Sequence, residues 1–304
     1  MAFLYNFFVW AYALMINIAA PFNEKASLWV KGRKNLLHKI ATDIAPNQRI
    51  IWFHSASLGE FEQGRPLIER IKKRNPEIKI FLTFFSPSGY EIRKNYPYAD
   101  YIYYLPIDSK SNAKKLISII EPEMVVFIKY EFWFNYFREI KRNNIPLYLV
   151  SGVFRTNQHF FKSWGGWQKK QLTNISYFFL QDDKSNDLLR SNGFTNTIVS
   201  GDTRFDRVSE ILDEDIKLPL ISKFKNKHKI ICAGSSWPAD EDILLDYFKS
   251  SPSSFKLIIA PHDISDAHID SIKAKFSDFE FVLYSEANIK EDLENKQILI
   301  IDSI

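Results

Sequence analysis

The sequence predicts an α/β protein with a largely parallel sheet, divided into two domains. Apolar runs of strand length alternate with amphipathic stretches from residue 50 onward, a pattern typical of βα units. Polar residues follow most of these runs directly, as is expected at the carboxyl edge of a parallel sheet. The chain has 304 residues, of which 46% are hydrophobic. At about 100–200 residues per domain, this length favours two cores.

The N-terminal stretch, residues 2–20, predicts a membrane-anchor helix. It has no charged side chain, and Asn6 and Asn17 stand out as polar within it. A helix of this length crosses the hydrocarbon layer. Five Lys or Arg side chains follow within residues 25–39, which places the rest of the chain on the cytoplasmic side. We therefore expect an anchor over residues 1–21. A signal peptide ending at Ala19-Ala20 and a helix packed on the protein itself remain alternatives.

Two series of apolar runs define the two expected domains. The first domain, residues 22–210, should contain strands at Ile50–Phe53, Ile78–Phe84, Tyr101–Leu105, Met124–Ile128, Leu147–Val150 and Tyr177–Leu180. The second, residues 211–304, should contain strands at Ile230–Ala233, Leu257–Ala260, Phe279–Leu283 and Ile298–Ile301. The boundary falls in the stretch 210–227, which mixes Lys and Asp.

Composition excludes several classes of protein. The formal net charge is +4, and no Lys/Arg run is long enough for a nucleic-acid stripe, so we expect no nucleic-acid partner. Cys232 is the single cysteine and lies in an apolar run. It excludes an intramolecular disulfide and predicts a buried thiol in a reducing compartment. No Cys/His spacing resembles a zinc site, and we expect no metal.

The polar segment 54–65 contains the first candidate catalytic residue, Glu60. The segment lies where the run 49–53 gives way to a helical pattern, so it is expected on a strand-to-helix turn. The helix N-terminus should favour the ionised carboxylate of Glu60. A carboxylate held at the edge of a crevice is a candidate general base.

A second candidate pair, Lys129 and Glu131, flanks Tyr130 after an apolar strand. If the extended geometry persists, the two side chains project to one side. They form either a local ion pair or a functional pair, with Glu131 near Glu60 and Lys129 facing an anionic substrate. The aromatic run 132–137 that follows is core, a stacking platform or a face for lipid.

In the second domain, Ser235 and Ser236 precede Pro238 at the expected start of a helix. This pattern fits ordinary helix capping or a phosphate held at the helix N-terminus. His262 follows the next strand. It is either a core histidine or a hydrogen-bond donor to a phosphate or a base. Arg204 is either a surface cation or a clamp for carboxylate or phosphate.

Seven motifs occur in order along the chain: HSASLGEFEQGRPLIE at 54–69, SPSGYE at 86–91, YLPID at 104–108, KYEFWFN at 129–135, VSGVFR at 150–155, GDTRFD at 201–206 and GSSWPADE at 234–241. Together they resemble the 3-deoxy-D-manno-octulosonic acid (Kdo) transferases of lipopolysaccharide synthesis. The resemblance implies a GT-B glycosyltransferase fold, with two Rossmann-like domains facing a cleft and an N-terminal membrane anchor. It implies an acceptor domain followed by a donor domain.

The resemblance also implies an activity. Kdo would pass from CMP-Kdo to a lipid A precursor, lipid IVA, with inversion and without a metal or cofactor, at the cytoplasmic face of the inner membrane. Glu60 matches the catalytic base and Glu131 a second functional carboxylate. Ser235, Ser236 and His262 would contact the donor nucleotide and phosphate, and Arg204 would lie near the donor. The acceptor side or the cleft would be formed by Ser57, Gly59, Lys129 and Arg155.

The sequence departs from the family pattern at two places. Pro261-His262-Asp263 stands where the family commonly has an arginine after the proline. The family also has a further C-terminal segment, so we expect this chain to be C-terminally truncated. Two other functions stay open: a GT-B enzyme for another nucleotide sugar, such as a UDP-hexose, and an inactive membrane-bound module.

Overall fold

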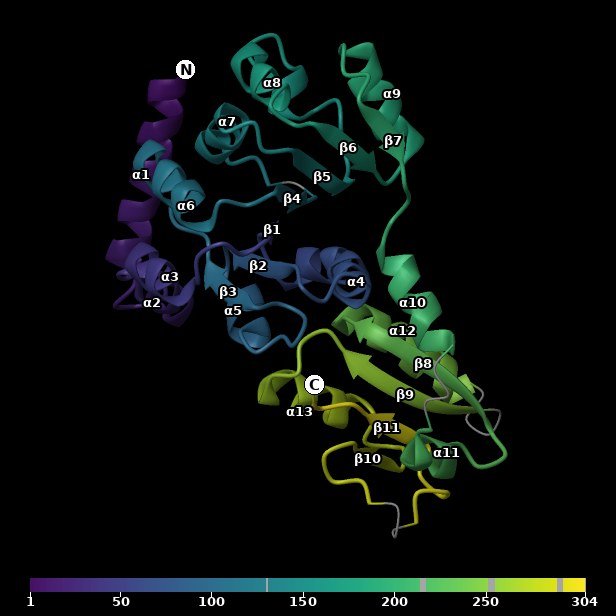
Figure 1. The fold of residues 1–304 in the computed structure, drawn as a ribbon. Coiled ribbons are helices and arrows are strands. Elements are labelled where there is room, and N and C mark those ends of the chain that lie inside the picture. The colour runs from purple at the N-terminus through teal and green to yellow at the C-terminus, as the bar shows by residue number, and fades with distance from the viewer. Residues whose placement is uncertain (130, 214–216, 251–254, 289–291, 304) are drawn as a thin grey trace. The chain divides into compact units, whose positions relative to one another are not determined.

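The computed structural model describes the chain except residues 130, 214–216, 251–254, 289–291 and 304. The chain forms two compact units, Met1–Asp213 and Glu214–Ile304 (Figure 1). Each unit is built around its own parallel sheet. Each is therefore described by itself below.

The first unit contains a seven-stranded parallel sheet. Its strands are β1 (Ile50–Ser55), β2 (Lys79–Phe84), β3 (Tyr101–Tyr104), β4 (Met124–Ile128), β5 (Leu147–Gly152), β6 (Tyr177–Leu180) and β7 (Thr197–Val199). They lie in the order β3-β2-β1-β4-β5-β6-β7. The chain therefore reverses its direction of winding between β1 and β4, the position where open α/β sheets bind ligands. The six predicted strands are present, and the three-residue β7 was not predicted.

Helices cover both faces of this sheet, because a parallel sheet buries both faces. Alternate residues of β1 point to opposite sides. Ile51 and Phe53 pack with Phe61 and Ile68 of α4 (Leu58–Arg74). Trp52 packs on the other face, with α3 (Leu36–Asp43), α6 (Lys110–Ile120) and α7 (Phe134–Arg142). The remaining helices of the unit are α2 (Glu24–Lys31), α5 (Pro87–Arg93), η1 (His159–Phe161), α8 (Gly166–Leu172), α9 (Asp183–Ser191) and α10 (Arg204–Asp213).

The N-terminal helix α1 (Ala2–Ala19) is long and apolar enough to cross a membrane, and it also packs against the first unit. The Tyr5 hydroxyl donates to Asp108, and Asn135 Nδ2 donates to Asn6 Oδ1 at 2.9 Å. The ring of Tyr12 stacks on Phe85 at 6.0 Å. The contacts agree with the alternative of a helix packed on the protein, while its role at a membrane stays a prediction.

The second unit contains a four-stranded parallel sheet in the order β10-β11-β9-β8. The strands are β8 (Lys229–Ser236), β9 (Phe255–Pro261), β10 (Phe281–Leu283) and β11 (Ile298–Ile300), with helices α11 (Pro219–Lys225), α12 (Pro238–Ser250) and α13 (Asp266–Lys275). Phe248, Ile259 and Ile272 lie in the core of this unit. The buried Lys256 donates to the carbonyl oxygens of Phe224 and Glu294 at 2.7 and 2.6 Å, which gives its charge acceptors inside the protein.

The prediction of a buried thiol is wrong, because Cys232 is exposed. It lies on β8, the terminal strand of the described sheet. The sequence prediction assumed that an apolar run is a strand with neighbours on both sides. A terminal strand covers its side chains less completely.

Candidate active site

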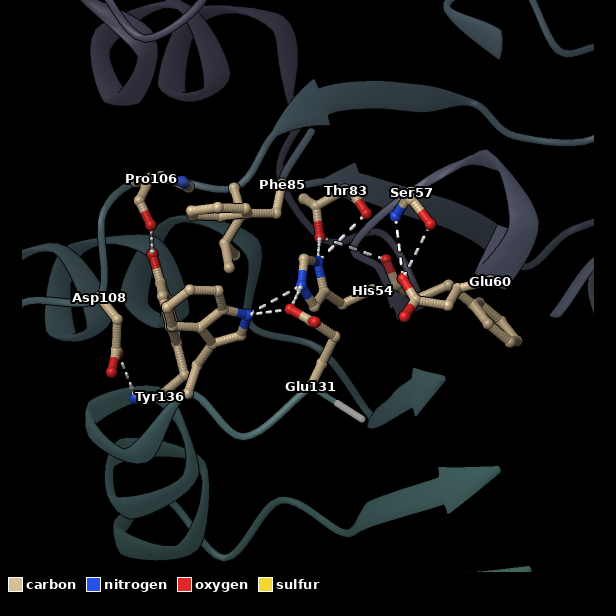
Figure 2. A network of polar contacts seen from close by, with 12 residues as sticks. His54, Ser57, Glu60, Thr83, Phe85, Pro106, Asp108, Glu131 and Tyr136 are labelled. Atoms are coloured by element: carbon tan, nitrogen blue, oxygen red, sulfur yellow. Dashed lines mark hydrogen bonds and ion pairs between the residues drawn. The ribbon is translucent and has the colours of Figure 1, made fainter. Parts of the chain in front are cut away.

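A buried histidine, His54, lies near the carboxyl end of β1, next to β4. Its Nδ1 atom is 2.9 Å from Thr83 Oγ1 and 3.2 Å from the Thr83 carbonyl oxygen, and its Nε2 atom is 3.2 Å from Glu131 Oε2. Figure 2 shows His54 with Glu131 on one side and the pair of Ser57 and Glu60 on the other. The cluster thus lies where the strand order reverses.

The hydrogen-bond network assigns the protonation of the imidazole at Nδ1. Thr83 Oγ1 accepts from Trp52 Nε1 at 2.8 Å and donates to the Phe53 carbonyl at 3.3 Å. Thr83 Oγ1 and its carbonyl are therefore acceptors for His54 Nδ1–H. The indole N–H of Trp133 points at both His54 Nε2, at 3.1 Å, and Glu131 Oε2.

Glu60 is held by the start of α4. Ser57 precedes the first helical residue, and its backbone N–H and its hydroxyl donate to Glu60 Oε2 at 3.0 and 3.2 Å, as in a capping box. Burial and the negative charge of Glu131 nevertheless raise the pKa of Glu60, and the bonds from Ser57 only partly offset them. The prediction that this site favours the ionised form of Glu60 is wrong, because the net effect of the surroundings is to raise the pKa of Glu60.

Lys129 does not continue the extended strand, so the condition for the predicted Lys129–Glu131 arrangement is not met. Its φ is 67°, and its N–H donates to the Val150 carbonyl at 2.8 Å. Tyr130 lies outside the described residues. Left-handed backbone costs a non-glycine residue about 1–2 kcal/mol, and such residues cluster at functional sites. Ser151, in the next strand, shares this geometry with a φ of 56°.

The aromatic run divides between core and site. Phe134, Tyr136 and Phe137 are buried in the core. Trp133 packs on Phe85 with ring centroids 4.7 Å apart while its N–H contacts the Glu131 and His54 pair. From the sequence, His54 has no predicted role, and Trp133 is predicted only as a member of the aromatic run 132–137. The available signal was a histidine at the end of a buried strand, directly before the polar turn.

The two arginines that the sequence predicts for the site, Arg204 and Arg155, lie in other surroundings. The Arg204 guanidinium pairs with Asp202, with Nε 2.9 Å from Oδ2, and Arg204 is 60% exposed. Asp202 also accepts from Gln63 Nε2 at 3.2 Å. Arg155 is exposed, and its backbone N–H donates to Gln158 Oε1 at 3.0 Å. Gly59 is exposed on the first turn of α4, and a Cβ added there would meet open space in the described part of the chain.

In the second unit, Ser235, Ser236 and His262 come together at the carboxyl ends of β8 and β9. Ser235 is exposed and has a φ of 56°. Ser236 is buried, and its hydroxyl donates to Glu241 Oε1 at 3.3 Å. The backbone N–H of His262 donates to the Ser236 carbonyl at 2.9 Å. The interpretation of His262 as a core residue is wrong, because it is exposed and stacks on Trp237 at 4.6 Å.

The start of α12 has internal partners for its polar groups. Pro238 is the first helical residue, as expected. Asp240 accepts from the Trp237 N–H at 2.9 Å, and the buried Glu241 also lies 3.0 Å from His268 Nε2 and 3.3 Å from Lys275 Nζ. These contacts favour helix capping over a phosphate site, because the carboxylate of Asp240 already accepts the backbone N–H of Trp237 at the start of the helix.

Comparison with known proteins identifies relatives over most of the chain. The family model for 3-deoxy-D-manno-octulosonic-acid transferase (kdotransferase) matches residues 30–207. A bifunctional glycosyltransferase/methyltransferase of Fusobacterium nucleatum is 24% identical over 85% of this chain and 41% of its own length. A 3-deoxy-D-manno-octulosonic acid transferase of Aquifex aeolicus is 26% identical over 82% of this chain and 63% of its own length. The chain thus spans about half the length of the curated relatives it matches.

Solved structures share the fold. The UDP-GlcNAc 2-epimerase from Neisseria meningitidis bound to UDP-GlcNAc aligns with a TM-score of 0.59 at 16% identity, over 84% of this chain and 72% of that one. This likeness shows a GT-B-like fold, and each unit of the chain has its own parallel sheet. The predicted α/β, GT-B fold class is confirmed, with an apolar helix at the N-terminus, and the cleft between the two domains stays a prediction.

Proposed function

The chain belongs to the 3-deoxy-D-manno-octulosonic-acid transferase family, and from this membership we propose that it transfers Kdo from CMP-Kdo to a lipid A precursor, lipid IVA. The transfer is a single displacement that inverts the anomeric carbon and uses no metal. The chain spans about half the length of the curated relatives it matches. The activity of the whole protein is therefore part of this proposal. The observation that supports it most directly is Glu60, a half-buried carboxylate with a raised pKa at the carboxyl edge of the sheet.

Glu60 acts as the general base in the proposed reaction. The acceptor hydroxyl attacks the anomeric carbon of Kdo, and its proton passes to Glu60 as the new C–O bond forms. The bond from that carbon to the CMP phosphate breaks, and its electron pair leaves on the phosphate oxygen. A carboxylate whose pKa is raised above its ordinary value is, in its ionised form, a stronger base.

The groups around Glu60 orient it and tune its proton affinity. Ser57 fixes one carboxylate oxygen through two donors. Glu131 places a second negative charge nearby, and His54 and Trp133 hold Glu131 in position. In this proposal Glu131 acts on the reacting groups through its charge.

The remaining predicted residues serve the substrates. Lys129 and Arg204 supply positive charge for the donor, which has a phosphate and a carboxylate. Ser235, Ser236 and His262 form the donor site of the second unit. Arg155 and the open surface at Gly59 belong to the acceptor side or the cleft.

Replacing Glu60 by Gln tests the proposal. Gln keeps the capping-box geometry, so the fold is retained while the base is removed. We expect Kdo transfer from CMP-Kdo to lipid IVA to fall about 10²- to 10⁴-fold, the usual contribution of a general base. Glu62→Gln is the matched control, since Glu62 lies on the same helix and pairs with Arg93 at 2.6 Å. Activity of Glu60→Gln within a few-fold of the unchanged chain contradicts the assignment.

We also propose that the protein works at the cytoplasmic face of the inner membrane. The support is α1, which exposes large apolar side chains including Phe3, Phe7 and Trp10. Flotation with vesicles of phosphatidylethanolamine and phosphatidylglycerol tests this location. A chain without residues 1–21 should stay with the soluble fraction, and its flotation would contradict a role of α1.

A further inference from the structure

We propose that an apolar pocket between α1 and the carboxyl edge of the first sheet binds one acyl chain of the lipid acceptor. This inference rests on the proposed function, because it names the part of the acceptor that the pocket would hold. The pocket has a volume of about 240 Å³. A cavity of about 150 Å³ already binds an apolar molecule of the size of benzene.

The pocket has walls from several elements. Phe8, Val9 and Tyr12 of α1 form one side, and Trp29, Phe85 and Trp133 contribute to the others. Tyr12 stacks on Phe85 at 6.0 Å and meets Trp29 edge-on at 6.2 Å. Aromatic walls of this kind give a large apolar contact area to a flexible chain.

Three of the polar residues at the pocket, Tyr5, Asp108 and Trp133, are directed towards protein partners, whereas the buried Trp29 Nε1 has no hydrogen-bond partner among the described residues. The Tyr5 hydroxyl donates to Asp108, and Asp108 also accepts the backbone N–H groups of Asn135 and Tyr136 at 3.1 and 3.0 Å. The indole N–H of Trp133 donates to Glu131 Oε2 and His54 Nε2. The pocket therefore offers a ligand mainly carbon atoms, which suits a hydrocarbon chain and disfavours a sugar.

Trp133 joins the pocket to the candidate active site. One part of the residue lines the pocket, packed on Phe85 at 4.7 Å, and its N–H contacts the carboxylate of Glu131. Figure 2 shows Phe85 and Asp108, two residues that line the pocket, on one side of His54 and Glu60 on the other. A chain seated in the pocket would hold the attached sugar beside the two carboxylates.

A lipid is the occupant that the surroundings favour. α1 also exposes apolar residues that do not line the pocket, such as Phe7 and Trp10. A groove of about 460 Å³ on α6 and α7, close to Asn135, has five cations and a single acid, Glu139, among its lining residues. The cations are Lys110, Lys114, Arg138, Lys141 and Arg142. Cations beside an apolar helix fit the anionic surface of a membrane, where acylated lipids are supplied.

A myristic acid that bears a photoreactive diazirine on its chain tests the pocket directly in the full chain. We expect cross-links at Phe85 and Trp133, located by mass spectrometry. Val9→Trp fills the pocket from α1 and should reduce these cross-links at least tenfold. Met15→Trp, at an exposed position of the same helix that does not line the pocket, should leave them unchanged. Cross-links confined to exposed residues such as Phe3 and Phe7, or unaffected by Val9→Trp, overturn the proposal.

A second variant and a series of fatty acids of increasing length distinguish a filled pocket from a misfolded protein. Ile107→Phe fills the same pocket from the loop after β3 and should match Val9→Trp if α1 remains docked. Competition by unlabelled fatty acids should strengthen about fourfold per added methylene until the chain fills the pocket, and then level off. A rise without a plateau indicates general hydrophobic adsorption and overturns the proposal.

The pocket and the proposed function can fail separately. Labelling needs no donor sugar, so pocket-specific cross-links without Kdo transfer would contradict the function alone. Transfer that depends on Glu60, with an unchanged KM for lipid IVA in Val9→Trp, would contradict the pocket alone. If both hold, Val9→Trp should raise the KM for the acylated acceptor and leave the KM for its deacylated form unchanged.

Discussion

His54 Nε2 lies 3.2 Å from Glu131 Oε2, and this contact links the carboxyl end of β1 to the segment after β4. The sheet changes its direction of winding between these two strands. β1 and β4 are neighbours in the sheet although they lie far apart in the sequence: β4 begins only at Met124, directly after Glu123. Carboxyl ends of adjacent parallel strands lie at one edge. The topology therefore brings Glu131 close enough to Glu60 to raise its pKa.

Replacing Glu131 by Gln should lower the pKa of Glu60, because it removes the nearby negative charge that helps to raise that pKa. In the complete reaction, the acid limb of the pH profile of kcat/KM reports the base of the free enzyme. We expect this limb to move to lower pH, with a smaller loss of activity at neutral pH than Glu60→Gln produces. Glu123→Gln, at the opposite end of β4 and paired with Arg49 at 2.8 Å, is the control. An unmoved limb contradicts the coupling.

Asp108 should make the stability of the first unit depend on pH. Burial raises its pKa to about 6, although the hydroxyl of Tyr5 and backbone N–H groups donate to it. The folded state then keeps a proton between about pH 4 and 6 that the unfolded state loses, so the free energy of unfolding falls as the pH rises through this window. The total change is up to about 3 kcal/mol, with little further change above pH 6.

Denaturant unfolding at several pH values, followed by tryptophan fluorescence, measures this effect. Trp237 lies in the second unit and the other tryptophans lie in the first, so the signal reports mainly on the first unit. Asp108→Asn should reduce the slope between pH 4 and 6, whatever its effect on the stability at neutral pH, and Glu60, whose pKa is also raised, accounts for part of the slope that remains. An identical slope in the variant would assign the dependence to another group.

The sequence predicts the scaffold well because its signals are local. Apolar runs of four to seven residues mark the strands of both sheets, since parallel strands are buried on both faces. β7 was missed because Thr197–Val199 is short and its neighbours are polar. Glu60 was found from its turn, but its proton affinity depends on Glu131, which is far away in the chain.

Three further features could not be predicted, because they depend on tertiary surroundings. The left-handed φ of Lys129 has no signal in a residue type that usually avoids it. His54 finds Thr83 and Glu131 on neighbouring elements. The exposure of Cys232 depends on the place of β8 in the sheet.

Ser235 is a residue whose backbone and hydroxyl can be tested independently. It lies between Gly234 and Ser236, where the register of β8 shifts against β9, and its φ of 56° is left-handed. Gly adopts this conformation without the penalty of about 1–2 kcal/mol, although its unfolded state gains entropy worth about 0.5–1 kcal/mol. Ser235→Gly should therefore stabilise the second unit by about 0.5 kcal/mol, from the difference of these two values. Ser235→Ala should keep the strain.

Calorimetric titration with CMP then separates the two roles of Ser235 in the proposed donor site. If its hydroxyl binds the phosphate, Ser235→Ala and Ser235→Gly should weaken CMP binding equally, by about 1 kcal/mol or fivefold for one hydrogen bond. Ser236→Ala is a different control, because its hydroxyl donates to the buried Glu241 and its loss should act on stability first. Gly at position 235 would relax the bulge and let the loop move. If CMP binding is weakened in Ser235→Gly but not in Ser235→Ala, the fixed backbone, and not the hydroxyl, holds the nucleotide. Unchanged binding in both serine variants would remove Ser235 from the donor site.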